Sequence, residues 1–537
     1  MVEDVDGEVI LFHDTFILRQ RYAEQEHNVT LTVPMFEPVP PNYYISVVSD
    51  RWLHAETRLP ISFKHLILPE KFPPPTPLLD LQPLPLSALH NKEFEALYSS
   101  SIQTFNKIQT QVFQALYTTD ENVFIGAPTG SGKTICAEFA LLRLWSKREP
   151  NARAVCIEPY QEMVDMRVAE WQQKFQEVQG GKEIVSLTGE TSADLRLLEK
   201  GDVIVCTPSQ WDVISRRWRQ RKNVQNVRLL IADEVQLVGG EIGPTYEVVI
   251  SRTRYVSAQT EIKTRIIACG VSLANAKDLG EWMNVPSHAI FNFSPSARPL
   301  DLDIHLHSFT IPHFPSLMIA MSKPAYLAII EHSPTKPVIV FVPSRKQCRL
   351  TVDDLLTHCA ADEKPDRFLN VDPEDLQVHL DHLSDAGLKE TLKKGIGYFH
   401  EALSKQDKRI VQRLFESGAI QVLVASKDTA WSLPVASYMV IVMGVQYYEG
   451  KEHRYVDYPV MDVLQMIGRA CRPREDDRSR CVLMCQATRK EFYKKFLGEG
   501  LPIESHLGNM LHDYFLAEIA VKTIENKQDA MVGALCI

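Results

Sequence analysis

Residues 126–134 read GAPTGSGKT, and they follow the apolar run Val123–Ile125 and precede a helical pattern over Thr134–Trp145. A short buried strand, a Gly-rich turn and a helix in this order are typical of a phosphate-binding loop. Gly130 and Gly132 let the backbone approach closely, so that N–H groups and the positive end of the helix dipole point at an anion. The stretch therefore predicts a nucleotide-binding α/β domain.

The side chains of this loop predict the ligand. Lys133 is placed to reach the β- and γ-phosphates of ATP, and the hydroxyl of Thr134 is placed to hold Mg²⁺. Ser131 lies between the two glycines, and Ala127 stands where the general pattern has its first glycine. An ordinary Gly/Ser turn before a helix is the alternative, and the Lys-Thr pair at the required offset argues against it. We predict ATP and Mg²⁺ as cofactors.

The strand pattern around the loop predicts two α/β domains in tandem. Between residues 100 and 290, apolar runs alternate with helical stretches, as a parallel sheet covered by helices on both faces requires. The pattern restarts at Pro337, and a polar, helical insertion is expected over residues 352–392. The predicted strands are Val123–Ile125, Ala154–Ile157, Ile184–Leu187, Val203–Cys206, Leu229–Ala232 and Arg265–Cys269, then Val338–Val342, Gln421–Ala425, Tyr438–Val442 and Cys481–Cys485.

The composition is that of a globular protein with three or four domains. The chain has 537 residues, of which 45% are hydrophobic and 23% charged, and its net charge is −10. The acidic balance argues against a protein that coats nucleic acid with its whole surface, while a local basic groove stays compatible with it. The cysteines lack paired C-x-x-C spacing, which favours buried thiols over disulfides or zinc sites. No apolar run approaches the length of a membrane span.

The first 60 residues alternate polar and apolar residues in the manner of β-strands, over Val29–Val33 and Tyr43–Val48. Two or three strands do not close a β-sandwich, so this part is interpreted as the end of a β-domain. Between Pro60 and Pro85 the chain is rich in proline and leucine, which favours an extended segment docked on a neighbouring domain over a flexible tether. Helical spacing over Ile503–Ala530 indicates the beginning of a further domain.

Asp233 and Glu234 follow the apolar run Leu229–Ala232. Alone, an Asp-Glu pair is usually a solvated turn. At the end of a strand beside a phosphate loop, the first carboxylate can hold Mg²⁺ through water, and the second can take the proton from the attacking water. We predict Asp233 as a metal ligand and both residues as catalytic.

Residues 465–473 in the second domain read QMIGRACRP, which places Arg469 and Arg472 three residues apart, on one face if the segment is helical. Across a cleft between the domains, they could reach the γ-phosphate as arginine fingers. A surface helix with two solvated arginines is the alternative. Gln465, Arg469 and Arg472 are predicted to be catalytic.

Phe105 and Gln109 lie upstream of the loop, four residues apart in TFNKIQTQVF. An aromatic ring could stack on adenine, and an amide could form hydrogen bonds with it. The pair is also compatible with an ordinary helix surface. A basic cluster over residues 216–222, RRWRQRK, could contact phosphates or another protein, or form a solvated helix end.

These motifs resemble those of the superfamily-two RNA helicases, which have two RecA-like domains, a winged helix and a Sec-type helical module. The chain resembles most the tandem-cassette helicases of the spliceosomal tri-snRNP, from near Val2 to Ala530. The stretches that carry this resemblance are LPISFKHLILPEKFPPPTPLLDLQPLP, RRWRQRKNVQN, KPVIVFVPSRKQ, DYPVMDVLQMIGRACRP and TIENKQDA.

The resemblance implies a division of the chain into five parts, and we expect the chain to be a fragment or a shortened gene product. Residues 1–60 would be the C-terminal part of an immunoglobulin-like β-domain, and residues 61–98 a Pro-rich docked linker. Residues 99–295 would be the ATP-binding RecA-like domain, residues 296–495 the second RecA-like domain, and residues 496–537 the start of a winged helix.

Several positions depart from the motifs of active family members. Gln236 replaces the His that follows Asp-Glu-Val, and Gly270-Val271-Ser272 replaces the Ser-Ala-Thr that couples hydrolysis to unwinding. Ser432 and Pro434 replace a Gly and an Asn, and proline offers neither an amide side chain nor a backbone N–H. Glu158 replaces a small neutral residue on the expected RNA path, where a carboxylate repels phosphate. Residues 207–212 read TPSQWD in place of TPEKWD.

Two functions follow from the resemblance and its departures. The first is a pseudo-helicase cassette that binds ATP and Mg²⁺, hydrolyses ATP weakly or not at all, and regulates an active partner cassette. The alternative is a catalytically active ATP-dependent RNA helicase. A pure interaction module without nucleotide is disfavoured, because it has no need for GSGKT. The resemblance implies a nuclear protein, with spliceosomal proteins and small nuclear RNA as partners and RNA bound weakly by this cassette.

Overall fold

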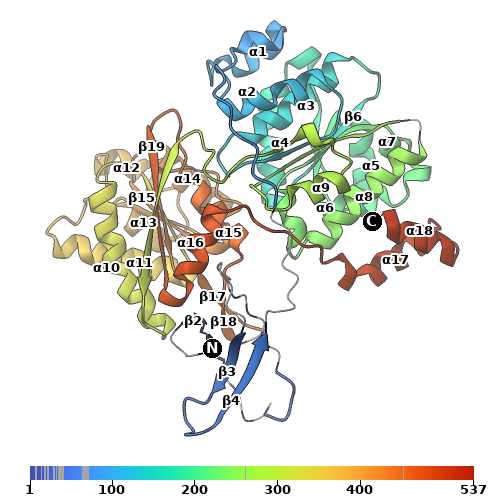
Figure 1. Ribbon diagram of the computed structural model, residues 1–537. Helices are drawn as coiled ribbons and strands as arrows, with labels where there is room; N and C mark the ends of the chain where they lie inside the picture. Colours follow the sequence, from blue (N-terminus) through green and yellow to red (C-terminus); the bar gives the residue numbers. More distant parts are fainter. Residues whose placement is uncertain are drawn as a thin grey trace.

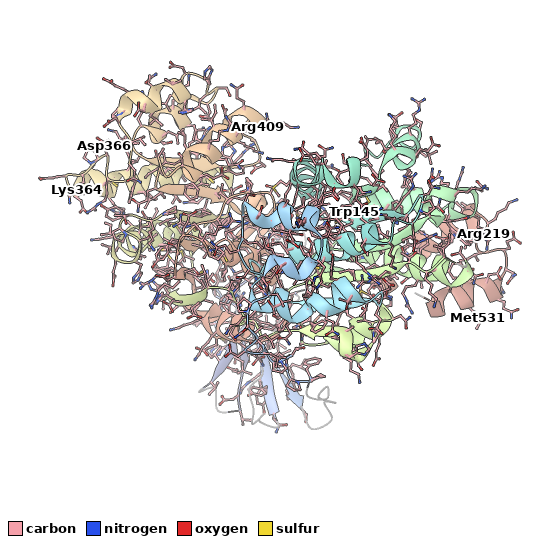
Figure 2. All side chains as sticks on the ribbon, turned by 90° about the horizontal axis from the view of Figure 1, so that it is seen from above. Trp145, Arg219, Lys364, Asp366, Arg409 and Met531 are labelled. Carbon is pink, nitrogen blue, oxygen red and sulfur yellow. The ribbon has the colours of Figure 1, made fainter. Side chains whose placement is uncertain are left out.

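The computed structural model describes the chain except residues 6–8, 14, 17, 19, 21, 22, 28, 30, 32, 34–41, 63–71, 261, 452 and 537. Two α/β domains lie side by side, with an antiparallel β-sheet below them and C-terminal helices against the first domain (Figure 1). Seen from above, Trp145 and Arg219 belong to the first domain, and Lys364, Asp366 and Arg409 to the second (Figure 2). The predicted α/β class with tandem parallel sheets is confirmed.

The first α/β domain contains a parallel sheet with the strand order β11-β5-β10-β9-β6-β8-β7. Its central strands are apolar and buried on both faces, because helices cover both sides. The strands are β5 (Val123–Gly126), β6 (Arg153–Ile157), β7 (Ile184–Ser186), β8 (Val203–Cys206), β9 (Val227–Ala232), β10 (Arg265–Gly270) and β11 (Ile290–Asn292). The helices are α1 (Lys92–Ser99), α2 (Lys107–Phe113), α3 (Lys133–Ser146), α4 (Gln161–Phe175), α5 (Thr191–Lys200), α6 (Pro208–Ser215), α7 (Lys222–Gln225), α8 (Gly243–Gln259) and α9 (Ala276–Trp282).

The second α/β domain repeats this architecture with a parallel sheet in the order β12-β19-β16-β13-β15-β14. The expected insertion is helical and contributes α12 (Pro373–Leu380) and α13 (Ala386–Leu392). The strands are β12 (Asp301–Phe309), β13 (Val338–Val342), β14 (Ile396–Phe399), β15 (Val422–Ser426), β16 (Met439–Met443) and β19 (Arg478–Gln486), with a hairpin of β17 (Gln446–Glu449) and β18 (Arg454–Asp457). The helices are α10 (Phe314–His332), α11 (Arg345–Ala361), α12 (Pro373–Leu380), α13 (Ala386–Leu392), α14 (Lys405–Glu416), α15 (Val460–Gly468) and α16 (Lys490–Gly498).

The N-terminal part forms an antiparallel sheet in the order β2-β1-β3-β4, from β1 (Val2–Glu3), β2 (Ile10–Phe12), β3 (Asn42–Val48) and β4 (Glu56–Ser62). The strand predicted over Tyr43–Val48 is therefore present. Residues 30 and 32 of the strand predicted over Val29–Val33 lie outside the described residues. The other three residues of this stretch do not form a strand. Phe12 packs against the second domain, where the guanidinium of Arg489 lies 4.7 Å from its ring centroid.

The Pro-rich segment runs along the first domain from residue 72 onward, and its preceding residues 63–71 lie outside the described residues. The backbone N–H of Thr76 donates to the Asn292 carbonyl at 2.7 Å. Further along, Lys107 forms an ion pair with Asp80 at 2.6 Å. The described part of the segment is thus docked, although its prolines lack N–H groups for a sheet ladder.

The chain returns from the second domain to the first before it ends. The N–H of Leu501 donates to the Ser272 carbonyl at 3.0 Å, and Leu501 lies in the core of the first domain. The helices α17 (Leu511–Ala520) and α18 (Lys527–Cys536) follow. Met531 of α18 lies near Arg219 in the view from above (Figure 2). Among the described residues, no helix has the length and apolar character needed to cross a membrane.

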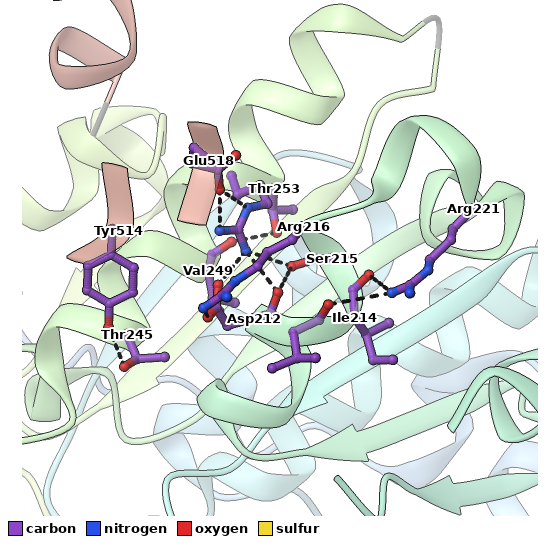
Figure 3. A network of polar contacts seen from close by, with 12 residues as sticks. Asp212, Ile214, Ser215, Arg216, Arg221, Thr245, Val249, Thr253, Tyr514 and Glu518 are labelled. Atoms are coloured by element: carbon purple, nitrogen blue, oxygen red, sulfur yellow. Dashed lines mark hydrogen bonds and ion pairs between the residues drawn. The ribbon is translucent and has the colours of Figure 1, made fainter. Parts of the chain in front are cut away.

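The basic cluster over residues 216–222 lies beside α17 and is held within the chain. Arg216 pairs with Asp212, and Arg221 donates to the Ile214 carbonyl at 2.6 Å (Figure 3). The buried guanidinium of Arg252 joins Asp212, at 2.7 Å, to Glu518 of α17, at 2.6 Å. Two cationic groups of the cluster, those of Arg216 and Arg221, thus have partners within the chain.

Replacing Glu518 with alanine is expected to release α17 from the first domain. Arg252 keeps Asp212 as a partner, so no buried charge is left unpaired and the domain should lose less than the roughly 3–5 kcal/mol of a broken buried pair. Amide hydrogen exchange over residues 511–520 should then accelerate, while exchange in β9 stays unchanged. Equal acceleration in both segments would show that the contact stabilises the whole domain.

Candidate nucleotide site

The phosphate loop connects β5 to α3 with the geometry that its sequence predicts. Gly130 and Gly132 have φ values of 87° and 86°, in the left-handed region that favours glycine. A Cβ on Gly132 would lie 2.4 Å from the side-chain nitrogen of Gln109. Both the backbone conformation and the close approach therefore require glycine here.

Two polar side chains of the loop fit an anionic ligand. The hydroxyl oxygen of Ser131 is buried and has no hydrogen-bond partner among the described residues. The ammonium group of Lys133 donates to the carbonyls of Ala127, at 2.8 Å, and Pro128, at 3.1 Å. Because α3 begins at Lys133, its free N–H groups point into the same loop. The donors present therefore suit the phosphates of a nucleotide.

Asp233 and Glu234 follow β9 at the same edge of the sheet. Glu234 is buried and has a φ of 52°, a backbone conformation that is uncommon for a residue with a Cβ and that costs free energy. Burial raises the pKa of Glu234, while Lys133 opposes the rise and Asp233 adds to it. The hydroxyl of Thr134 and the carboxylate of Asp233 are oxygen donors of the kind that Mg²⁺ prefers. The donor chemistry therefore fits Mg²⁺.

Gln236 connects Glu234 to the segment that follows β10. Its side-chain amide donates to Oε2 of Glu234, and its carbonyl oxygen accepts from the N–H of Val271 at 3.2 Å. A Cβ on Gly270 would lie 2.8 Å from that oxygen and 3.1 Å from Val235. Two of the departures noted in the sequence, Gln236 and Gly270, thus fit each other: the missing Cβ makes room for the glutamine.

Replacing Gly270 with serine is expected to displace Gln236 from Glu234. The added Cβ overlaps the glutamine side chain, which should cost about 1–3 kcal/mol of unfolding free energy. The double variant Gly270→Ser with Gln236→Ala should recover part of this loss, because the two residues compete for one space. Thermal unfolding of the four proteins measures the coupling, and additive effects would contradict it.

Residues of the second domain reach the loop across the cleft. The hydroxyl of Thr129 donates to the side-chain carbonyl of Gln465 at 3.3 Å, and a Cβ on Gly468 would lie 2.4 Å from Thr129. Arg298 donates to the Thr129 carbonyl at 3.4 Å. The two domains are therefore in contact at the loop, and Gln465 lies where it was predicted to act.

Arg469 is buried beside this contact. Burial lowers the pKa of Arg469 to about 10, and Glu234 opposes the change. One terminal nitrogen of its guanidinium donates to the Ala430 carbonyl at 3.1 Å, while Nε has no partner among the described residues. The guanidinium thus keeps a free donor near Glu234, as an arginine that contacts a phosphate requires.

Arg472 differs from its prediction. The helix α15 ends at Gly468, so Arg469 is its C-cap and Arg472 lies beyond the helix. The two arginines therefore do not share a helical face. The guanidinium of Arg472 pairs with Asp476 at 2.8 Å and Glu475 at 2.6 Å. Two carboxylates thus pair with Arg472 within the second domain, and its catalytic role stays a prediction.

The two side chains predicted to contact adenine are both buried. The ring of Phe105 is fully buried and lies 4.9 Å from that of Phe139, so it has no open face on which a base can stack. Gln109 is buried as well and donates to the Gly132 carbonyl at 3.1 Å. Its neighbour Asn106 donates to the Ser131 carbonyl at 2.9 Å. Both amides support the loop, and Asn106 was missed because its role depends on this tertiary contact.

Glu158 lies inside the domain rather than on an RNA surface. Its side chain has no exposed surface, and Nε of Arg167 donates to it at 2.8 Å. Burial raises the pKa of Glu158, and the ion pair with Arg167 opposes the rise. The predicted repulsion of an RNA phosphate therefore does not arise at the protein surface. Arg167 was not identified from the sequence, because its contact with Glu158, nine residues away, depends on the fold.

Comparison with known families decides the identity of this domain. Residues 106–278 match the family model of the DEAD/DEAH box helicases. The chain carries a DEAD/DEAH box helicase domain. Residues 1–62 match the model of the Sec63 Brl domain. Both matches agree with the resemblance inferred from the motifs.

Full-length relatives support the same family. The chain is 57% identical over 531 residues to the U5 small nuclear ribonucleoprotein 200 kDa helicase of Mus musculus. This alignment covers 99% of this chain and 25% of that protein. The chain is 52% identical to the pre-mRNA-splicing factor brr2 of Schizosaccharomyces pombe, covering 99% of this chain and 24% of that protein. The chain thus spans about a quarter of the length of these helicases.

A solved structure supports the fold of the helicase domains. The crystal structure of the DUF1998 helicase MrfA bound to DNA and AMPPNP aligns with a TM-score of 0.60. The alignment covers 81% of this chain and 57% of MrfA, at 15% sequence identity. At this identity the likeness concerns the arrangement of the two α/β domains.

Proposed function

We propose that this chain is a pseudo-helicase cassette that binds ATP with Mg²⁺ and hydrolyses it weakly or not at all. The observation that carries the proposal is the hydrogen bond from Gln236 to Glu234. It engages the carboxylate that would accept the proton of attacking water, in a site whose phosphate loop is otherwise complete. Binding groups are thus present, while the general base is already engaged by a side chain.

The charge of the cleft between the domains supports the proposal that RNA binds weakly. A cavity of about 710 Å³ lies there, lined by residues of both domains. Glu162, Glu241, Asp428 and Asp462 contribute carboxylates, and Lys427 is the one lysine or arginine that the described lining contains. A strand crossing both domains at this cavity would meet a net negative charge, which repels phosphate.

The proposed cellular role follows from the relatives. Their names describe a helicase of the U5 small nuclear ribonucleoprotein and a pre-mRNA-splicing factor. We place this chain in the nucleus, with spliceosomal proteins, small nuclear RNA and an active helicase cassette as partners. In this role a bound nucleotide would stabilise the contact between the two α/β domains and thereby the surface offered to partners.

The alternative is an active ATP-dependent RNA helicase, and one observation favours it. Arg469 and Gln465 lie at the loop with the two domains in contact, as hydrolysis across a cleft requires. Catalysis would then need Gln236 to release Glu234 when nucleotide and RNA bind.

Titration of a fluorescent ATP analogue tests the proposal. Saturable binding whose affinity does not change with single-stranded RNA is expected, because RNA and nucleotide are uncoupled in a pseudo-helicase. RNA that tightens nucleotide binding tenfold or so would favour the active helicase. Absence of binding by folded protein would contradict both functions.

A further inference from the structure

Arg167 of α4 occupies an unusual position between carboxylates of the nucleotide site. Its Nε donates to Glu158 at 2.8 Å, and one terminal nitrogen lies 3.3 Å from Oδ2 of Asp233. The other terminal nitrogen contacts Glu170 at 3.1 Å. Below it, the ring centroid of Trp171 lies 5.2 Å from the guanidinium carbon. The guanidinium is therefore held on several sides, and one of its partners is the predicted metal ligand.

The position of Arg167 depends on Glu158. The side chain of Arg167 is 12% exposed and that of Glu158 is 0% exposed, so each requires a partner. An arginine guanidinium is always protonated in proteins, and that of Arg167 lies within 3.3 Å of the carboxylates of Glu158, Asp233 and Glu170. The guanidinium thus stays charged while it faces Asp233. Glu158 is also one of the residues that depart from the family motifs.

Each carboxylate oxygen of Asp233 already has one partner. Its Oδ1 accepts the backbone N–H of Glu234 at 3.0 Å, and its Oδ2 faces Arg167. A divalent ion that approaches Asp233 meets a positive charge already in place, and the two cations repel each other at short range in a partly buried site. Thr134 keeps its hydroxyl for a metal that arrives with the nucleotide.

We propose that Arg167, positioned by Glu158, is a built-in counter-ion of Asp233 that makes nucleotide binding nearly independent of Mg²⁺. The proposal rests on the proposed nucleotide binding and refines it. In this site the nucleotide binds through the loop donors with or without the metal. Arg167 is a positioning residue for Asp233 and does not touch the phosphates.

The test compares the affinity for a fluorescent ADP analogue in excess Mg²⁺ and in excess EDTA. For the unmodified chain, the two dissociation constants should agree within about threefold. In the double variant Glu158→Gln with Arg167→Gln, both charges are absent and Asp233 is free for the metal. Mg²⁺ should then tighten binding by about tenfold or more.

A matched control is Arg228→Gln, which removes an arginine of the same domain from a partly exposed pair with Glu149 at 3.2 Å. Its Mg²⁺ dependence should equal that of the unmodified chain. A Mg²⁺ effect of tenfold or more in the unmodified chain would overturn the proposal, whether or not the double variant folds. Absence of binding in both buffers would instead overturn the proposed function, and the counter-ion role with it.

Discussion

Lys133→Ala is expected to weaken ATP binding by at least about a hundredfold, because charge-assisted hydrogen bonds to two phosphates are lost. Lys133 is buried and is held within the loop by the carbonyls of Ala127 and Pro128. Its ammonium group therefore needs only a small movement to meet phosphate oxygens. Alanine also removes the charge that opposes the raised pKa of Glu234. Titration of a fluorescent ATP analogue measures the effect.

The matched control for this experiment is Lys147→Ala. Lys147 caps the other end of α3 and pairs with Asp120 at 2.8 Å. Its loss changes the net charge by the same amount as the loss of Lys133, and it should leave nucleotide affinity within about twofold. An unchanged affinity in Lys133→Ala would show that the loop does not bind nucleotide through its lysine.

Glu138→Ala is expected to have the largest effect on stability, about 3–5 kcal/mol of unfolding free energy in the first domain. Glu138 is fully buried in α3, directly behind the loop. Its carboxylate accepts from the hydroxyl of Tyr98 at 2.8 Å, the indole N–H of Trp171 at 3.1 Å and the ammonium of Lys174 at 2.6 Å. Alanine leaves buried donors unpaired and a cavity beside them.

Two further variants serve for comparison with the loss of unfolding free energy in Glu138→Ala. Glu138→Gln keeps an acceptor but loses the charge that pairs with Lys174, so its loss of stability should be intermediate. Glu149→Ala, in an exposed ion pair of the same domain, should change stability by less than about 1 kcal/mol. Chemical denaturation followed by circular dichroism orders the three. An unfolding transition of Glu138→Ala equal to that of the unmodified chain would contradict the assigned network.

The sequence predicted the central strands well, because they are apolar and buried on both faces. The predicted and observed bounds of the strand before the loop differ by one residue, Gly126. Of the four edge strands of the two parallel sheets, β7 was predicted, whereas β11, β12 and β14 were missed. β12 reads DLDIHLHSF and contains only exposed and partly buried residues, since a sheet edge is covered less than its centre. β14 is short and contains Gly397, which weakens a strand pattern.

The site shows the same division between local and long-range information. The loop glycines, Lys133 and the Asp233–Glu234 pair depend on local order, and the structure brings them together. The roles of Phe105 and Arg472 depend on what surrounds them. Phe105 is enclosed by other rings, and Arg472 is held by carboxylates beyond the end of α15. Spacing alone does not reveal such neighbours.

The structure also shows which side chains the residues that depart from the family motifs contact. Gln236 and Gly270 were separate substitutions in the sequence, and in the structure they share one space. Glu158 was expected to repel RNA, and it instead positions Arg167 on Asp233. Both findings place side chains on the two carboxylates that hydrolysis would use.

Phosphate release with and without single-stranded RNA tests the central claim most directly. The chain should be measured at saturating ATP and Mg²⁺, with Glu234→Gln as the blank that lacks a general base. We expect release at or near the rate of Glu234→Gln, and no stimulation by RNA. RNA-stimulated release well above that blank would contradict the pseudo-helicase and favour an active helicase. In that case the hydrogen bond from Gln236 to Glu234 would have to break during the reaction.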